Sequence, residues 1–328
     1  MLKINRRQAI AASVGACVGA WVGAPALAQS FPTKPVKLVL PYAAGGPSDF
    51  TIRLLAKELT PALGQSVIVE NIAGGQGAIG SRRVSKSEPD GHTLLLATSA
   101  THAANVFLMK DLGYDPIKDF TPVSGIGDLQ HIVVIRNNLP VNNIADFIRY
   151  AKANPGKMNY GSSGIGSGGH LGIEAFKRRT GVDLQHVPFV SAAQLNNELL
   201  ADRIDIAITS MPVAVVHVRA KTIRALAMAS ENRSPQLPEL PTLKELGIQG
   251  CESDTWMGLW APPGTPAAIV ERINREVVTI LKRPDIAESL TRNAITLNVR
   301  ETKVFAEYVA SEIKRYGELV RQIGIQPS

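Results

Sequence analysis

Residues Val36–Asp49, VKLVLPYAAGGPSD, place a short β-rich run, a glycine-containing loop and the start of a helical segment in direct succession. The same order continues with β-rich runs near Val67–Glu70 and Thr93–Ala97 and helical segments near Ser48–Leu63 and Ala78–Ser87. Strands that alternate with helices in this way predict an α/β fold whose strands run parallel in layers.

A second series of the same kind follows. Its expected strands lie near Ile132–Ile135, Met158–Tyr160, Leu184–Val187, Ile204–Ile208 and Ile223–Ala227, and its expected helices near Asn143–Ala153, Gly168–Arg179, Ala192–Leu200 and Val213–Ala220. Residues 231–266 are rich in proline and glycine, which is typical of connections. The tail from Pro266 to Ile323 has helical apolar spacing, so we expect it to contain no strand and to pack on an earlier part of the chain. The 328 residues suffice for two lobes, each with its own core.

The first residues have the pattern of an export signal. Basic residues precede the apolar run Ala9–Gly23 and the small-residue motif Ala26–Ala28, so we expect residues 1–28 to be a signal peptide cleaved before Gln29. An arginine pair also fits a twin-arginine leader, which leaves the Sec and Tat routes open. Lipidation at Cys17 is a further alternative.

Charge and composition exclude several classes of function. Loss of the three leader cations would reduce the formal net charge from +7 to +4. No basic cluster with interleaved aromatic residues is present, which argues against nucleic-acid binding. If Cys17 leaves with the leader, Cys251 has no disulfide partner in the chain, and no histidine or cysteine spacing predicts a metal site.

Two glycine-rich stretches resemble enzyme motifs but lack essential residues. Residues Gly75–Gly80, GQGAIG, match a dinucleotide fingerprint, yet the next strand is followed by Thr98 and Ser99 instead of an acid for the ribose. The stretch Tyr160–His170, YGSSGIGSGGH, has no phosphate-loop lysine, and isoleucine stands where a nucleophile elbow around Ser163 needs glycine. We therefore expect no cofactor and no enzymatic activity.

Three glycine-rich loops form the candidate binding site. The loops Tyr42–Asp49, Gly74–Gly80 and Tyr160–His170 each connect a strand to a helix, where main-chain N–H groups can bind an anion. Either of the first two loops alone could equally be a tight turn.

Three polar side chains of this region have a structural alternative. Asp49 is more simply an N-terminal helix cap than a functional acid. His170 could equally contact a ligand or brace its helix, and for His102 we favour a ligand contact. The remaining histidines, His92, His131, His186 and His217, are expected to be structural.

A series of motifs points to one family. These are Pro32–Pro35, Pro41–Asp49, Val69–Asn71 with Gly74–Gly80, Pro89–Gly91, Tyr114–Val123, Pro155–Gly164, His186–Phe189, Arg224–Ala227 and Arg233–Pro238. In this order, across Phe31 to Ile325, they resemble the periplasmic substrate-binding proteins of tripartite tricarboxylate transporters, the Bug-type receptors.

The resemblance implies a two-lobed periplasmic-binding-protein clamshell, type II-like, with two crossing strands near Asp128 and near Thr255–Leu259. Residues 29–128 and 253–328 would form lobe 1, and residues 129–252 lobe 2. A periplasmic receptor of this kind would capture a small carboxylate between the lobes and deliver it, as a monomer, to membrane permease subunits. A carboxylate sensor with a signalling partner and, less favoured, an enzyme acting on a carboxylic acid are the alternatives.

The resemblance also implies which residues contact the ligand. They are Tyr42, Ala44, Gly45, Gly46, Ser48, Asp49, Gly75, Gly77, Ile79, Ser99, Thr101 and His102 in lobe 1, and Ser163, Gly164, Ser167, His170, Val190, Ser191 and Ser210 in lobe 2. The chain departs from the usual family pattern at Val190–Ala192 and at Thr209–Pro212, so the resemblance does not identify the ligand. The neutral residues there favour an acid without an α-ammonium group.

Overall fold

The structure is a computed structural model that describes residues 31–327. The expected signal peptide and Cys17 lie outside this range. Within residues 31–327, no helix combines the length and the apolar character that a bilayer crossing requires.

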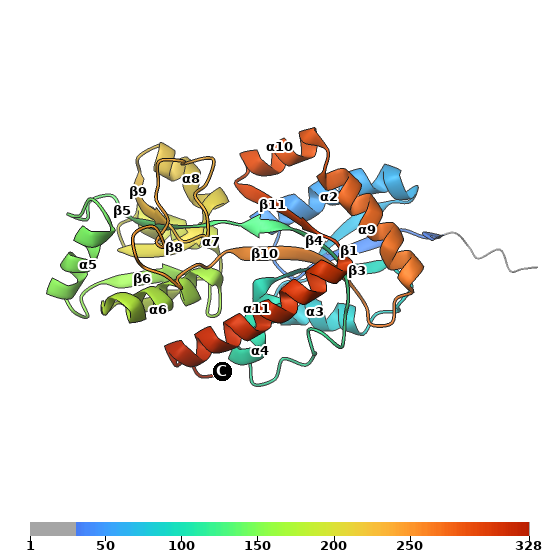
Figure 1. The fold of residues 1–328 in the computed structure, drawn as a ribbon, viewed down its shortest axis with the longest axis horizontal. Helices are drawn as coiled ribbons and strands as arrows, with labels where there is room; N and C mark the ends of the chain where they lie inside the picture. Colours follow the sequence, from blue (N-terminus) through green and yellow to red (C-terminus); the bar gives the residue numbers. More distant parts are fainter. Residues whose placement is uncertain (1–30, 328) are drawn as a thin grey trace, which may run out of the picture.

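Two β-sheets form the framework of the molecule (Figure 1). The strands of sheet A are β1 (Val36–Leu40), β2 (Val67–Asn71), β3 (Thr93–Thr98), β4 (Thr121–Leu129), β10 (Thr255–Ala261) and β11 (Ile295–Arg300). Those of sheet B are β5 (His131–Arg136), β6 (Asn159–Ser162), β7 (Gln185–Pro188), β8 (Ile206–Ser210) and β9 (Ile223–Met228). Sheet A has the order β11-β4-β10-β3-β1-β2, and sheet B has the order β7-β6-β8-β5-β9.

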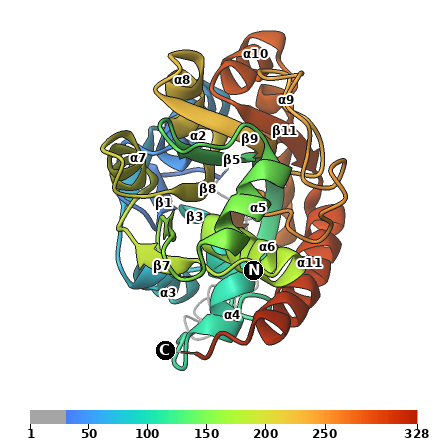
Figure 2. The same ribbon diagram turned by 90° about the vertical axis from the view of Figure 1, so that its left-hand side faces the viewer.

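Helices cover both faces of each sheet. They are α2 (Pro47–Leu63), α3 (Ala78–Ser85), α4 (Asn105–Leu108), α5 (Ile144–Ala153), α6 (Gly168–Thr180), α7 (Ala192–Leu200), α8 (Met211–Arg219), α9 (Ala267–Leu281), α10 (Pro284–Arg292) and α11 (Thr302–Ile323). Two short turns, η1 (Gly75–Gly77) and the π-helical η2 (Ala100–Ala104), precede α3 and α4. Figure 2 shows α5 and α6 on one side of sheet B and α7 and α8 on the other.

Alternating side chains explain why both faces are covered. Leu38 and Leu40 of β1 join the core under α2 and α9, whereas Val39 joins the core on the opposite face. In β5, Val133 packs with the α5 and α6 side chains, and Ile132 packs with those of α7 and α8. A strand that is apolar on both faces must be buried between two layers of helices.

The prediction of parallel strands is confirmed for only part of each sheet. β1 pairs in parallel with β2 and β3, and β6 pairs in parallel with β7 and β8. β10 and β11 instead lie antiparallel to β4, and β5 lies antiparallel to β8 and β9. The chain leaves sheet A along β4 and returns along β10, and adjacent outgoing and returning strands must run in opposite directions.

The prediction that the tail contains no strand is wrong. β11 pairs with β4 through Ile295 and Leu297, between helices α10 and α11. Six residues of alternating pattern within a largely helical segment are too short to stand out by period. The tail does pack on earlier elements: α9 and α10 complete the core of sheet A. The helix α11 also reaches α6, where the Arg178 guanidinium donates to the Gln322 carbonyl (Figure 1).

The chain crosses between the sheets at two places that are bonded to each other. Gln130 alone separates β4 from β5, and Asp254 immediately precedes β10. The carboxylate of Asp254 accepts hydrogen bonds from the His131 N–H (3.2 Å) and the Ser230 hydroxyl (2.5 Å). Asp254 therefore ties the returning crossing to the outgoing one.

Asp254 should make stability depend on pH. Burial raises the pKa of Asp254 from 3.8 to about 7, and the nearby carboxylate of Asp128 pushes it the same way. A pKa raised by folding means that the folded state binds the proton more tightly. The resulting stabilisation is complete below about pH 4 and is lost as the pH rises toward 7.

The variant Asp254→Asn keeps an acceptor oxygen but cannot ionise. We expect the unfolding free energy of the wild type minus that of the variant to fall between pH 4 and pH 7, by at most about 1.4 kcal/mol per pH unit. Denaturant titrations of both proteins across this range measure the difference. The buried histidines are common to both proteins, so a difference that stays constant with pH would contradict this assignment.

Candidate functional site

The loop before α2 is braced by an aspartate inside the first helical turn. Gly46 is the N-cap residue, without a side-chain cap bond, so the prediction that Asp49 is itself the cap is wrong. The Asp49 carboxylate instead accepts bonds from the Gly45 N–H (3.0 Å), Arg53 Nε (2.9 Å) and Asn71 Nδ2 (3.0 Å). Burial alone would raise the pKa of Asp49, but these bonds outweigh it and keep the pKa below 3.8. Both carboxylate oxygens are therefore engaged within the protein.

Polar contacts join the other loops of lobe 1 to this one. The Tyr42 hydroxyl lies 2.6 Å from Thr98 Oγ1, and burial raises the pKa of Tyr42 to about 12. The Thr101 hydroxyl bonds the main chain of Thr98. A Cβ atom at Gly77 would lie 2.6 Å from Thr101 Cγ2, so only glycine permits this approach. Thr101 is fully buried and holds the loops together.

Gln76, between the two glycines of η1, was not among the predicted site residues. Its φ of 53° is in the left-handed region, which is unfavourable for a residue with a side chain. Asn105 Nδ2 holds the Gln76 carbonyl at 3.0 Å. Gly75 and Gly77 predict a turn at this place. Nothing in the sequence pattern indicates that Gln76, the residue between them, also has a left-handed backbone conformation.

His102 is buried among aromatic side chains, which argues against the expectation of a ligand contact. Its ring is fully buried, with ring centroids 4.7 Å from both Phe120 and Trp260. Burial lowers the pKa of His102 to about 3. The π-helical turn η2 directs this side chain into the aromatic core instead of toward the loops.

In lobe 2, His170 braces the loop before α6. Its ring Nδ1 accepts a hydrogen bond from the Gly166 N–H (3.1 Å). Its main-chain N–H donates to the hydroxyl of Ser167, the N-cap residue of α6 (3.3 Å). The ring stacks on His186 at 4.3 Å. Burial, with a smaller contribution from His186, lowers the pKa of His170 to about 4. Of the two alternatives for His170, bracing is the one that these contacts describe.

A serine and a histidine meet below this loop. Ser162 Oγ lies 2.7 Å from His186 Nε2, an arrangement that could suggest a nucleophile and its base. Ser162 is fully buried, however, and its hydroxyl also donates to the Gly164 carbonyl. The pair fixes the shape of the loop.

Two glycines of this loop are required by packing. A Cβ atom at Gly168 would lie 2.4 Å from the Ser253 carbonyl oxygen, and one at Gly169 would lie 2.0 Å from the Ile208 carbonyl oxygen. The start of α6 therefore sits directly against the crossing segment and β8. Part of the glycine content that predicted anion binding thus has a purely structural cause.

The loops of the two lobes meet. A Cβ atom at Gly166 would lie 2.6 Å from Leu108 Cδ1 and 3.6 Å from Gln76 Oε1, both in segments that follow strands of sheet A. On the rest of the rim, Ser191 caps α7 by accepting the Gln194 N–H (3.2 Å), and Ser210 is the N-cap residue of α8.

The predicted site residues differ in their exposure. Ala44, Gly45, Gly75, Ile79, Val190 and Ser191 are exposed, and Tyr42, Gly46, Ser48, Ser163, Gly164, Ser167 and Ser210 are partly exposed. Asp49, Gly77, Ser99, Thr101, His102 and His170 are buried. The buried members support the loops, and the others are the ones that a ligand can reach.

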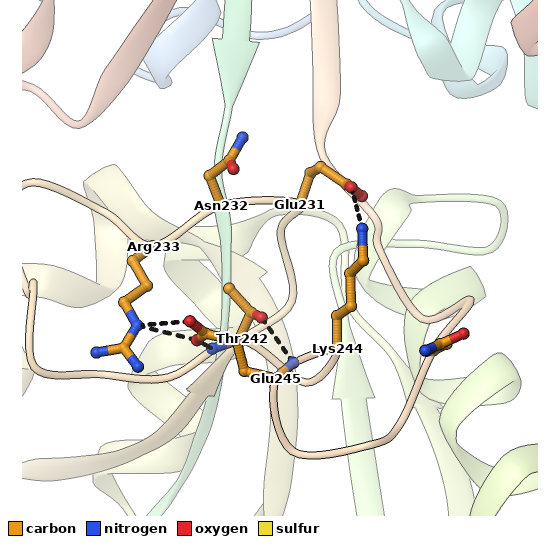
Figure 3. Close-up of a pocket in the computed structure, with 7 residues that line it drawn as sticks. Glu231, Asn232, Arg233, Thr242, Lys244 and Glu245 are labelled. Atoms are coloured by element: carbon orange, nitrogen blue, oxygen red, sulfur yellow. Dashed lines mark hydrogen bonds and ion pairs between the residues drawn. The ribbon is translucent and has the colours of Figure 1, made fainter.

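A separate hollow of about 600 Å³ lies in the connection that follows β9 (Figure 3). Its lining residues are Glu231, Asn232, Arg233, Thr242, Lys244, Glu245 and Gln249. Arg233 pairs with Glu245 at 2.9 Å, and Lys244 pairs with Glu231. These charges neutralise one another within one segment. The hollow is therefore a less favourable anion-binding site than the glycine loops. Within residues 31–327, no group of three His, Cys, Asp or Glu residues is placed to hold a metal ion.

Comparisons with known proteins agree on one family of transport receptors. The family model described as "Tripartite tricarboxylate transporter family receptor" matches residues 51–325. The structure is similar to that of the periplasmic binding protein BugD, with 31% identity, a TM-score of 0.82, and 91% of this chain and 100% of BugD covered.

Two similar structures contain a bound acid. Rpa4515 of R. palustris with adipate has 34% identity and a TM-score of 0.86, with 91% of this chain and all of that chain covered. MatC of Rhodopseudomonas palustris with bound malate has 32% identity and a TM-score of 0.81, with 88% and 100% covered.

Gln76 provides a test of the loop geometry. The variants Gln76→Gly and Gln76→Ala both remove the side chain, but only glycine relieves the left-handed backbone. We expect the glycine variant to have the higher unfolding free energy, by about 1 kcal/mol. At the exposed helical position Glu307, the order should reverse by a similar amount, because glycine weakens a helix relative to alanine. Urea titration of the four variants measures these differences. If Gln76→Ala is more stable than Gln76→Gly, the inference that the backbone at Gln76 is strained is wrong.

Proposed function

This chain belongs to the tripartite tricarboxylate transporter receptor family, and on that premise we propose that it captures a small carboxylate between its lobes and delivers it to membrane permease subunits. Members of the family are periplasmic binding proteins. The proposal includes export with residues 1–28 as the signal peptide, by the Sec or the Tat route, and action as a monomer without catalytic activity.

The proposal rests mainly on one observation. The three candidate loops lead into the N-termini of helices and contain almost no charged side chains. The loops Tyr42–Asp49 and Gly74–Gly80 precede α2 and α3, and Tyr160–His170 leads into α6. The first turn of a helix has N–H groups without intrahelical partners and a partial positive charge, both of which favour a carboxylate. Asp49 is the only Asp, Glu, Lys or Arg in these three loops, and its oxygens are occupied.

We further propose that the lobes close by rotation about the two crossings. The strands of sheet A come from residues 36–129 and 255–300, and those of sheet B from residues 131–228, which supports lobe 1 as 29–128 with 253–328 and lobe 2 as 129–252. A bound acid would shift the population toward the closed form by its greater affinity for that form. Small-angle scattering should then show compaction when ligand is added.

Gly45 offers a test with a matched control. Gly45 has φ +91° and Gly247 has φ +82°, and a Cβ atom at either would have no neighbour within 4 Å. Valine should therefore strain the two backbones similarly, but only Gly45 lies in a candidate loop. We expect Gly45→Val to abolish binding of every acid and Gly247→Val to leave binding intact.

The measurement is calorimetry on folded protein, after a thermal-shift screen of carboxylic acids. A ligand at 100 times its Kd stabilises the native state by about 2.7 kcal/mol, which is readily detected as a higher Tm. If no carboxylic acid raises the Tm of the wild type, or if both valine variants bind equally well, the proposed site is refuted.

Both carboxylate oxygens of Asp49 are hydrogen-bonded within the protein, which leads to a prediction about the charge of the ligand. An α-ammonium group in the cleft would find no free carboxylate in the three loops, and a buried unpaired charge is costly. We therefore expect glutarate to bind at least about tenfold more tightly than glutamate, which is a difference of about 1.4 kcal/mol. Tighter binding of glutamate in calorimetry at pH 7 would show that a carboxylate is available after all.

A further inference from the structure

Large apolar side chains are exposed on the facing rims of the two lobes. Ile79 of lobe 1 is 51% exposed, and Ile165 and Val190 of lobe 2 are 41% and 92% exposed. Isolated exposed apolar residues are common, but a group of them around a binding site calls for an explanation.

Contacts of neighbouring residues place Ile165 beside the seam, which is the place where the loop Tyr160–His170 meets the loop Gly74–Gly80, and place Ile79 and Val190 on the two sides that adjoin it. Ile165 precedes Gly166, which lies against Gln76 Oε1 and Leu108 of lobe 1. The Ile79 side chain lies over the loop of lobe 1, since its Cδ1 is 2.8 Å from where a Gly74 Cβ would be.

Val190 lies on the same rim as Ile165. It follows Phe189, whose carbonyl oxygen is 3.7 Å from a Cβ position at Gly164, in the loop that contains Ile165. Its own N–H donates to Gln194 Oε1 at 3.3 Å, so the main chain is held while the side chain projects into solvent.

The seam has little to offer a polar ligand body. Apart from Tyr160, which is fully buried, and His170 and His186, the lobe 2 stretches Tyr160–His170, His186–Gln194 and Thr209–Pro212 contain no ionisable side chain. Ser167 and Ser191 are engaged as helix caps, which leaves Ser163 and Ser210 as the other partly exposed hydroxyls in these stretches. A hydroxyl group on the ligand body would give up water hydrogen bonds and meet isoleucine and valine in return.

We propose that Ile79, Ile165 and Val190 form an apolar clamp that selects acids with an unsubstituted hydrocarbon body over hydroxylated ones. The inference rests on the proposed carboxylate binding and adds the class of acid. Closure would bury the three side chains against the methylene groups of the ligand, and each buried methylene strengthens binding about fourfold.

Calorimetry with two series of acids tests the clamp. The probes are the diacids succinate, glutarate and adipate, the monoacids butyrate and hexanoate, and malate as hydroxylated succinate. In any series that binds, affinity should rise about fourfold per methylene, and succinate should bind more tightly than malate. Equal or tighter binding of malate, or no gain with chain length, overturns the clamp and leaves the proposed function standing. If none of these acids binds but another carboxylic acid of the thermal-shift screen does, the clamp alone fails; if no carboxylic acid binds at all, the proposed function fails and the clamp fails with it.

A pair of valine variants identifies the side chain responsible. Val190→Ser should flatten the increase of affinity with chain length, weakening the longest bound acid by at least about threefold and the shortest hardly at all. Val216, which is 58% exposed on α8, provides the matched control, and Val216→Ser should leave every affinity unchanged. Both substitutions are at the surface and should alter stability by less than about 0.5 kcal/mol. Equal effects of the two variants would refute the role of Val190.

Discussion

The hydrogen bonds of Asp254 to His131 and Ser230 connect the two places where the chain passes between its sheets. The placement of the loop Tyr160–His170 relative to the two other candidate loops depends on this junction, because that loop follows a strand of sheet B and the other two follow strands of sheet A. The start of α6 is held against it as well, with Gly168 directly on the Ser253 carbonyl. The position of the loop before α6 is therefore tied to the crossing segment, and the proposed rotation of the lobes would take place about this line.

Side chains in the loops mostly support the main chain. Asp49 and His170 each accept the N–H of a loop glycine, and Ser162 and His186 fix the base of the second-lobe loop. Burial lowers the pKa of His170 to about 4, which keeps the ring neutral and its Nδ1 able to accept at neutral pH. Rigid loops at helix starts are pre-organised, so little of the binding energy would be lost in ordering them.

The main chain of the glycine loops and the side chains of the exposed rim would have different roles in the proposed site. This difference would allow one architecture to bind different acids. In the proposed site, main-chain groups and helix starts would recognise any carboxylate, since they depend on the fold and hardly on side-chain identity. The exposed rim, which includes Ile79, Ile165 and Val190, bears side chains that can change without disturbing a core. Specificity can thus vary at the rim while the junction and the braces remain.

Local pattern in the sequence was sufficient to predict most strands and helices, the helix Ala192–Leu200 among them, because periodicity records which faces of an element are buried. The resemblance to known receptors added the clamshell and the two crossings. Tertiary structure alone decided strand direction, the short strand Ile295–Arg300, the burial of His102 against Trp260, and the strain at Gln76. These features arise from contacts between residues far apart in the chain, and a single sequence records the composition of such contacts but not which residues meet.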